Sequence, residues 1–266
     1  MKSETIEKVS GSVAGAVFIL SCYPLDMRKT IYQTGEVPNL IITRSNPLTL
    51  FKGALFPTLF GAAGGFVFYS SMENSRRFVA RLKGKTNLNF SDSLLAGGIT
   101  GFVYGLYSSF AESVKVSMQV NRGEFTNSLQ FFKFKVREKG LAWFFRGLAP
   151  TVIVEVVASS VFLATYYHLC EFYFRKGGID DFIAGGLSGM AAWNAMILFD
   201  TMKSQVLSKN ELLSLKNQIE ILREISRNQL MKSYFPGLLR SALANSTSMW
   251  SYQLLSTYLL KYHLKK

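Results

Sequence analysis

A pattern of small and charged residues occurs three times along this chain of 266 residues. In each copy two glycines lie four residues apart, an acid follows eleven residues after the second glycine, and a lysine follows three residues later. The copies are Gly11, Gly15, Asp26 and Lys29; Gly97, Gly101, Glu112 and Lys115; and Gly185, Gly189, Asp200 and Lys203. One copy would be ordinary for a helix. Three copies in phase predict a single domain over 1–266, built from tandem units near 1–86, 87–176 and 177–266.

Each unit contains two long apolar stretches, and about 20 apolar residues suffice to cross a bilayer as a helix. The six stretches lie near 6–33, 57–82, 91–121, 150–175, 180–207 and 238–262. Charged residues make up only 18% of the chain, whereas a soluble domain carries about 25%. The sequence therefore predicts an all-α membrane protein with six transmembrane helices. Short amphipathic helices are predicted in the second and third connections, at 128–139 and 211–228.

The net charge of +13 raises the question of an anionic partner. Basic residues gather in short polar segments between the apolar stretches, which favours lipid head groups over nucleic acid. The two cysteines form no CxxC motif, and the N-terminal segment resembles neither a signal peptide nor a transit peptide. The two histidines, His168 and His263, have no metal-ligand spacing, and no nucleophile elbow or phosphate loop is present. We therefore expect neither an enzyme, nor a metal, nor a cofactor.

These features together resemble the mitochondrial carrier family. Its signature ends each odd-numbered helix with Pro-x-acid-x-x-base, followed four residues later by glutamine. The first unit matches this signature with Pro24, Asp26, Lys29 and Gln33. The second unit has Phe110 in place of proline, followed by Glu112, Lys115 and Gln119, and the third has Leu198, Asp200, Lys203 and Leu207. The second and third units are thus degenerate copies.

The resemblance implies a threefold pseudosymmetric bundle whose odd-numbered helices converge at one end. Each acid would there meet the lysine of a neighbouring helix, and three such pairs would close a matrix gate. Gln33 and Gln119 would brace these pairs, and Pro24 would kink the first helix. The alternative is that each acid and lysine form a solvated pair within one helix near the membrane interface.

The family closes the opposite end with an aromatic-acid-x-x-base motif on each even-numbered helix. Only the second stretch keeps the acid and the base, as Glu73 and Arg76. The fourth stretch has Tyr167 and Cys170 at these positions, and the sixth has Thr257 and Leu260. An acid and a base on one helix cannot close a ring, so the cytoplasmic gate is predicted to be weak or apolar.

Counting from Gly53, Gly147 and Gly237 places the family's substrate contacts at Phe60, Glu155 and Asn245. Glu155 is the only charge at these positions, and an ionisable residue at mid-span predicts a functional role. In the family an acid there accompanies amino-acid or amine substrates, although Val154 replaces the usual arginine. The alternative is that Glu155 bonds a neighbouring helix.

Two further pairs, Lys52–Gly53 and Arg146–Gly147, resemble the family's cardiolipin sites, in which a helix N-terminus and a base hold a phosphate. Cardiolipin is therefore the expected bound lipid. The alternative is that Lys52 and Arg146 are ordinary basic residues at the membrane interface.

Two functions follow from the resemblance. The first, which we predict, is transport of a small metabolite across the mitochondrial inner membrane by alternating access, with both termini in the intermembrane space. The second is a structural or accessory subunit of a larger inner-membrane complex, such as a respiratory complex. The complete set of matrix-gate acids and lysines favours transport, whereas the lost prolines and cytoplasmic motifs favour the subunit.

Overall fold

The computed structural model describes residues 3–34, 55–85, 87–120, 128–140, 143, 145, 147–174, 178–209 and 213–264. Within these ranges, the side chains at 3–4, 24–34, 55–56, 114–120, 128–129, 131–132, 135, 229 and 263–264 lie outside the description.

Eight helices form the described part of the chain, and six of them are long. The long helices are α1 (Ser3–Thr34), α2 (Leu55–Lys83), α3 (Phe90–Val120), α5 (Leu148–Phe172), α6 (Ile179–Ser208) and α8 (Arg227–Leu264). They correspond to the six predicted apolar stretches. Two short helices, α4 (Ser128–Lys139) and α7 (Leu215–Glu224), occupy the predicted amphipathic segments. Helix α7 is shorter than the predicted segment 211–228, because α8 already begins at Arg227. Helix α8 also continues through Pro236.

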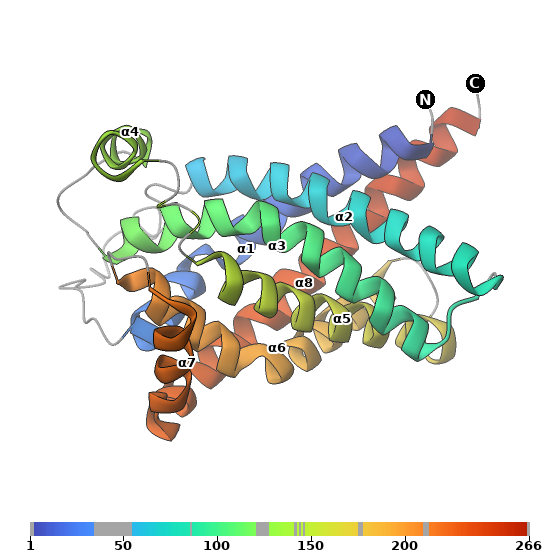
Figure 1. The fold of residues 1–266 in the computed structure, drawn as a ribbon. Coiled ribbons are helices and arrows are strands. Elements are labelled where there is room, and N and C mark those ends of the chain that lie inside the picture. The colour runs from blue at the N-terminus through green and yellow to red at the C-terminus, as the bar shows by residue number, and fades with distance from the viewer. Residues whose placement is uncertain are drawn as a thin grey trace, which may run out of the picture.

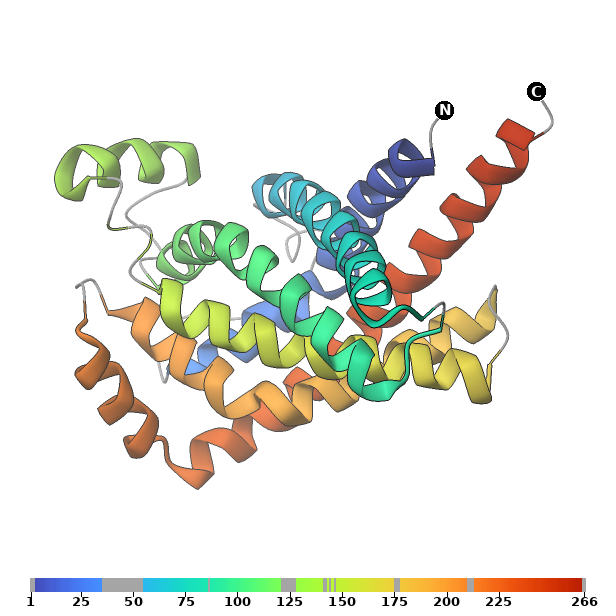
Figure 2. The same cartoon turned by 45° about the vertical axis from the view of Figure 1, so that its right-hand side comes forward.

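The six long helices pack together in one bundle (Figures 1 and 2), and the contacts between neighbouring helices close it into a ring. Helix α1 packs against α2 and α8, and the ring continues from α2 through α3, α5 and α6 back to α8. Both termini lie at one end of this bundle, which we call the termini end (Figure 1). Helices α4 and α7 lie at the other end, which we call the α4/α7 end (Figure 1).

Four of the long helices are apolar enough over their length to cross a membrane, in the windows Thr5–Tyr23, Phe90–Ser113, Leu148–Phe172 and Ile179–Ser208. Helices α2 and α8 are also long enough but more polar. Both nevertheless expose large apolar side chains on the outside of the bundle, including Leu59, Phe66 and Phe78 on α2 and Leu239, Leu243 and Leu254 on α8. Such an outer surface suits lipid and would be a liability in water.

The repeated glycines lie where the two long helices of each unit cross. A Cβ atom on Gly15 of α1 would lie 2.0 Å from the carbonyl oxygen of Gly61 on α2. On Gly101 of α3 it would lie 2.2 Å from the carbonyl oxygen of Glu155 on α5, and on Gly189 of α6 it would lie 2.6 Å from that of Ser241 on α8. These glycines therefore let paired backbones approach closely, as small residues do between membrane helices.

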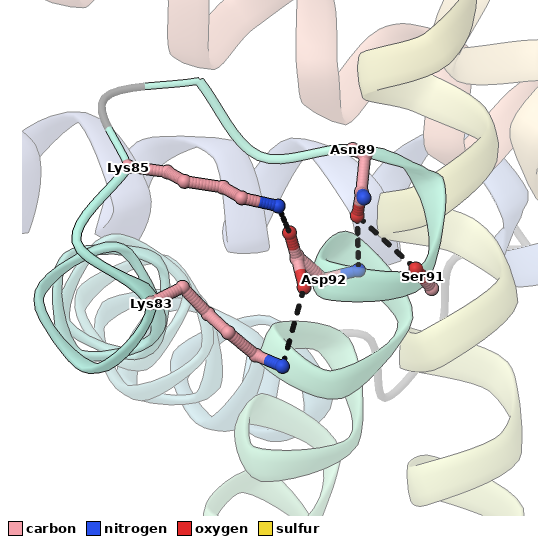
Figure 3. Close-up of polar contacts among 5 residues, drawn as sticks. All are labelled: Lys83, Lys85, Asn89, Ser91 and Asp92. Atoms are coloured by element: carbon pink, nitrogen blue, oxygen red, sulfur yellow. Dashed lines mark hydrogen bonds and ion pairs between the residues drawn. The ribbon is translucent and has the colours of Figure 1, made fainter.

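The turn between α2 and α3 joins the first two units at the termini end, and a cluster of polar contacts holds it (Figure 3). The side-chain oxygen of Asn89 accepts a hydrogen bond from the backbone N–H of Asp92 at 3.0 Å and thereby caps α3. The Asp92 carboxylate lies 3.6 Å from the Lys85 ammonium and 4.0 Å from that of Lys83. The lysines are half-exposed, so the start of α3 is tied to the end of α2 at the bundle surface.

The crossing of α3 and α5 supplies a matched pair of substitutions. Gly97→Ala would place a methyl group 2.4 Å from the Ser159 carbonyl oxygen, whereas the neighbouring Gly98→Ala meets only the Ser160 hydroxyl at 3.2 Å. We expect Gly97→Ala to destabilise the bundle by about 1–3 kcal/mol through overpacking. Gly98→Ala should be neutral or stabilising by up to about 1 kcal/mol. Thermal unfolding of both variants in lipid nanodiscs checks this, and equal midpoints would contradict it.

Candidate functional site

A cavity of about 190 Å³ lies inside the ring, and all six long helices contribute to its wall. Much of the wall is small or aromatic, with glycines on α1 and α2 and rings such as Phe68, Tyr104 and Phe162. Five charged residues of the described chain also line it, namely Glu112, Glu155, Asp200, Lys203 and Arg240. Of these five described residues, three are acids and two are bases.

Lys203 is the centre of a charge cluster at the cavity wall. Its ammonium lies 3.5 Å from a carboxylate oxygen of Glu112 on α3 and 3.6 Å from one of Asp200 on α6. The Lys203 side chain is 7% exposed, that of Asp200 is 2% exposed and that of Glu112 is 26% exposed. Buried charges persist only where opposite charges compensate them. The contact to Glu112 connects two odd-numbered spans, and the contact to Asp200 lies within one helix.

The other predicted matrix-gate side chains, those of Pro24, Asp26, Lys29, Gln33, Lys115 and Gln119, lie outside the described residues. Their backbone is helical, and α1 continues through Pro24 to Thr34. The structure thus brings Glu112, Asp200 and Lys203 together, and the full ring of three pairs stays a prediction.

The predicted contact residues lie at different places relative to the cavity. Glu155 and Asn245 are both partly buried and line it. The Asn245 amide donates a hydrogen bond to the Ser241 carbonyl of its own helix at 2.8 Å. Phe60 is not among the described lining residues, because its ring stacks on Phe110 with centroids 6.0 Å apart, and its neighbour Gly61 lines the cavity instead. A substrate role for each of these residues stays a prediction.

Arg240 on α8 is a cavity residue that the sequence count missed. Its guanidinium carbon lies 5.5 Å from the centroid of the Phe18 ring on α1. The count from Gly237 places a contact at Asn245, five residues after Arg240, and the positions equivalent to 240 in the other units are the uncharged Phe56 and Pro150. A signal was nevertheless present, because a lone arginine inside an apolar stretch is rare unless it faces a cavity or a partner.

Toward the termini end, stacked and hydrogen-bonded tyrosines connect neighbouring helices. Tyr69 on α2 stacks on Tyr252 of α8 with centroids 4.1 Å apart. The Tyr69 hydroxyl is hydrogen-bonded to the Ser248 hydroxyl at 2.8 Å. The Tyr166 hydroxyl of α5 donates to the buried Asp181 of α6 at 2.8 Å. These contacts connect α2 to α8 and α5 to α6.

Glu73 and Arg76, the two residues of the predicted cytoplasmic gate, lie on α2 one and two turns beyond Tyr69, toward the termini end. The guanidinium carbon of Arg76 lies 3.6 Å from the centroid of the Tyr167 ring on α5. Tyr167 occupies the position in its unit that Glu73 occupies in the first. The electron-rich ring face attracts a cation, so an aromatic residue here partners a base as a carboxylate would.

The sites expected to bind cardiolipin are described only in part. Lys52, Gly53 and Arg146 lie outside the described residues. Gly147 is buried at the start of α5, where a Cβ atom would lie 2.4 Å from a methyl carbon of Leu207. Bound cardiolipin stays a prediction. No group of three or more His, Cys, Asp or Glu side chains in the described ranges could hold a metal ion.

Lys203→Gln should destabilise the protein because it leaves two carboxylates, one of them fully buried, without their shared cation. Removing one partner of a buried ion pair costs about 3–5 kcal/mol. The loss here should lie below that range because Glu112 is partly exposed. The control is Lys209→Gln, which removes an exposed lysine just after α6. Equal unfolding midpoints for the two variants would show that the cluster does not stabilise the bundle.

Tyr167→Leu should weaken the termini end because it removes the ring face under Arg76. A partly desolvated cation–π contact contributes about 1–2 kcal/mol. Tyr167→Phe keeps that face and should stay close to the wild type. The unfolding midpoints of the two variants, measured in the same nanodiscs, check this contact. A leucine variant as stable as the phenylalanine variant would mean that Tyr167 contributes only apolar packing.

Comparison with known proteins agrees with this architecture. The family described as mitochondrial carrier protein matches residues 86–177 and 175–263. Mitochondrial substrate carrier family protein S of Dictyostelium discoideum is 27% identical over 276 residues, which cover 93% of this chain and 95% of that protein. The mitochondrial carnitine carrier of Saccharomyces cerevisiae is 26% identical, with 96% and 88% covered. The mitochondrial arginine transporter BAC2 of Arabidopsis thaliana is also 26% identical, with 75% and 72% covered.

The two family matches together span more than half of the chain. They confirm the predicted all-α fold with six membrane helices, and they agree with the ring of long helices around a charged cavity. Members of this family are multi-pass mitochondrial membrane proteins that move small molecules and are not enzymes. The chain belongs to the mitochondrial carrier family, and it is a metabolite transporter of the mitochondrial membrane.

Proposed function

We propose that this carrier moves a small charged metabolite across the mitochondrial inner membrane by alternating access. The observation that carries the proposal is the cavity, whose wall includes residues of all six long helices and five charged side chains. A site lined by every long helix of the ring changes shape whenever the helices rock against one another. Two relatives named for carnitine and for arginine agree with a small charged substrate.

Non-covalent contacts between helices lie toward both ends of the cavity, which supports the opening of either end in turn. The cluster around Lys203 joins α3 and α6 toward the α4/α7 end. The Tyr69–Tyr252 stack and the Arg76–Tyr167 contact join α2 to α8 and to α5 toward the termini end. A few kcal/mol separate two states held by such contacts, so binding of a substrate can shift their populations.

The α4/α7 end faces the matrix in this proposal, and both termini lie in the intermembrane space. The support is the acid–lysine signature, since the resemblance assigns it to the matrix gate and it lies near the C-terminal ends of α3 and α6. The accessory-subunit alternative has no comparable support, because a subunit that only filled space would not require five charges on the wall of an interior cavity.

The test is exchange by the purified full chain in liposomes that contain cardiolipin. Radiolabelled amino acids, betaines and dicarboxylates are supplied outside vesicles that hold the same compounds. We expect saturable exchange of at least one class, and a loss of about tenfold or more in Lys203→Gln but not in Lys209→Gln. A folded wild-type protein that exchanges no compound would overturn transport and favour the accessory role.

A further inference from the structure

We infer that Tyr104 on α3 is a specificity-determining residue of this carrier, whose hydroxyl binds a hydroxyl group of the substrate in the cavity. The inference deepens the proposed function and rests on it. The charged side chains of the cavity wall act on the charge of a substrate, whereas a neutral phenol separates molecules of equal charge that differ in one polar group. The expected occupant is therefore a small charged metabolite that carries a hydroxyl.

The position of Tyr104 belongs to the threefold repeat. It lies three residues after the second glycine of its unit, and the equivalent residues of the other units are Phe18 and Ala192. All three residues line the cavity, from α1, α3 and α6. The repeat thus brings this position to the cavity wall in every unit, and of the three residues only Tyr104 has a polar side-chain atom.

Neighbours on two helices hold the Tyr104 ring in place. The ring of Phe68 on α2 meets it edge-on, with centroids 5.4 Å apart and an angle of 83° between the planes. The ring of Tyr107, one turn later on α3, has its centroid 6.2 Å away. Gly64 on α2 leaves room beside the hydroxyl, because a Cβ atom there would lie 3.4 Å from the hydroxyl oxygen. The ring is therefore positioned before a substrate arrives, which lowers the cost of binding.

The Tyr104 hydroxyl differs from the hydroxyls of two nearby tyrosines. That of Tyr107 donates a hydrogen bond to the Phe60 carbonyl at 2.9 Å, and that of Tyr69 is hydrogen-bonded to Ser248 at 2.8 Å. Within the described chain, no protein atom hydrogen-bonds the Tyr104 hydroxyl. Its oxygen is also not one of the enclosed side-chain oxygens that lack a partner. The oxygen is therefore accessible, and the space next to its residue is the cavity.

An accessible hydroxyl without a protein partner discriminates between substrates. Water satisfies such a group until a substrate displaces the water. The substrate must then replace the lost hydrogen bond, because a buried polar group left unpaired is costly. A substrate hydroxyl can both donate and accept, so it replaces either bond that water makes, whereas a methylene group at the same place replaces neither. We expect this difference to favour the hydroxylated molecule by about tenfold.

The experiment uses three pairs of compounds whose members differ by one hydroxyl. They are carnitine with 4-trimethylammoniobutanoate, malate with succinate, and choline with ethyltrimethylammonium. The pairs are zwitterionic, dianionic and cationic, so the preference is measured whichever charge class the cavity accepts. Competition for exchange and ligand-induced thermal stabilisation are both measured on the full chain in cardiolipin-containing bilayers. We expect the wild type to favour the hydroxylated member of at least one pair by about tenfold.

A matched pair of variants assigns this preference to Tyr104. Tyr104→Phe removes the hydroxyl and keeps the ring, so binding of the hydroxylated compound should weaken by about tenfold while its partner compound binds as before. The control is Tyr107→Phe, which removes a hydroxyl one turn away on the same helix. Tyr107 is not among the described residues that line the cavity, and its hydroxyl already has a partner, so the preference should stay at the wild-type value. A merely structural role of Tyr104 would lower the unfolding midpoint without changing this preference.

The outcomes separate this inference from the proposed function. A preference that is unchanged in Tyr104→Phe, or lost equally in Tyr107→Phe, would overturn the role of Tyr104. A wild-type protein that favours the hydroxylated member of no pair would overturn it as well. Tyr104→Leu, which also lacks the hydroxyl, decides the matter if Tyr104→Phe does not fold. Stabilisation that prefers a hydroxylated compound, without exchange of any compound by the folded wild type, would overturn transport and support the hydroxyl site.

Discussion

Compensation of charge inside the bundle is the constraint on which the rest of this structure depends. Lys203 has 7% of its side chain exposed and Asp200 has 2%, in a chain whose outer surface is apolar. An ion transferred from water to such a place costs several kcal/mol unless an opposite charge meets it. The contact between Lys203 and Asp200 lies within α6, so it would not fix the position of a neighbouring helix. The contact between Lys203 and Glu112 fixes α3 relative to α6, because it requires the two helices to keep the same relative height and rotation.

Different kinds of contact connect the helices toward the two ends of the cavity. Among the described contacts beside the cavity, the ion pairs of Lys203 lie toward the α4/α7 end, whereas the Tyr69–Tyr252 stack and the Arg76–Tyr167 cation–π contact lie toward the termini end. Counting the charges of the family signature alone would make the α4/α7 end dominate, since the even-numbered helices keep only Glu73 and Arg76 of the second motif. An aromatic pair contributes about 0.5–1.5 kcal/mol beyond its burial, and a partly desolvated cation–π contact contributes a similar amount. These contacts therefore offset part of the bias that the charges create.

Much of the fold could be predicted from the sequence because the repeat is periodic and the spans are long. The six helices follow from the apolar stretches, and α4 begins and ends where the amphipathic segment was predicted. Arg240 was missed because it breaks the threefold pattern, so counting from the repeated glycines passes over it. Phe60 was predicted as a substrate contact, and the count alone could not show that its ring stacks on that of Phe110. The Tyr69–Tyr252 stack and the Arg76–Tyr167 contact were missed, because no sequence pattern distinguishes a tyrosine at a gate from a tyrosine in ordinary helix packing.

At three positions where this sequence departs from the family signature, the substituted side chain packs against a neighbouring helix. These contacts explain how a degenerate sequence retains the architecture. Phe110, in place of proline, lies between the rings of Phe60 and Phe145, at centroid distances of 6.0 and 6.5 Å. Leu207, in place of the bracing glutamine, is fully buried against Gly147 at the start of α5. Tyr167, in place of an acid, receives the Arg76 guanidinium. In each case an apolar or aromatic contact between helices stands where the signature has a kink, a hydrogen bond or a charge. Because such contacts also connect neighbouring helices, loss of the signature at these three positions is not evidence that the carrier has lost transport.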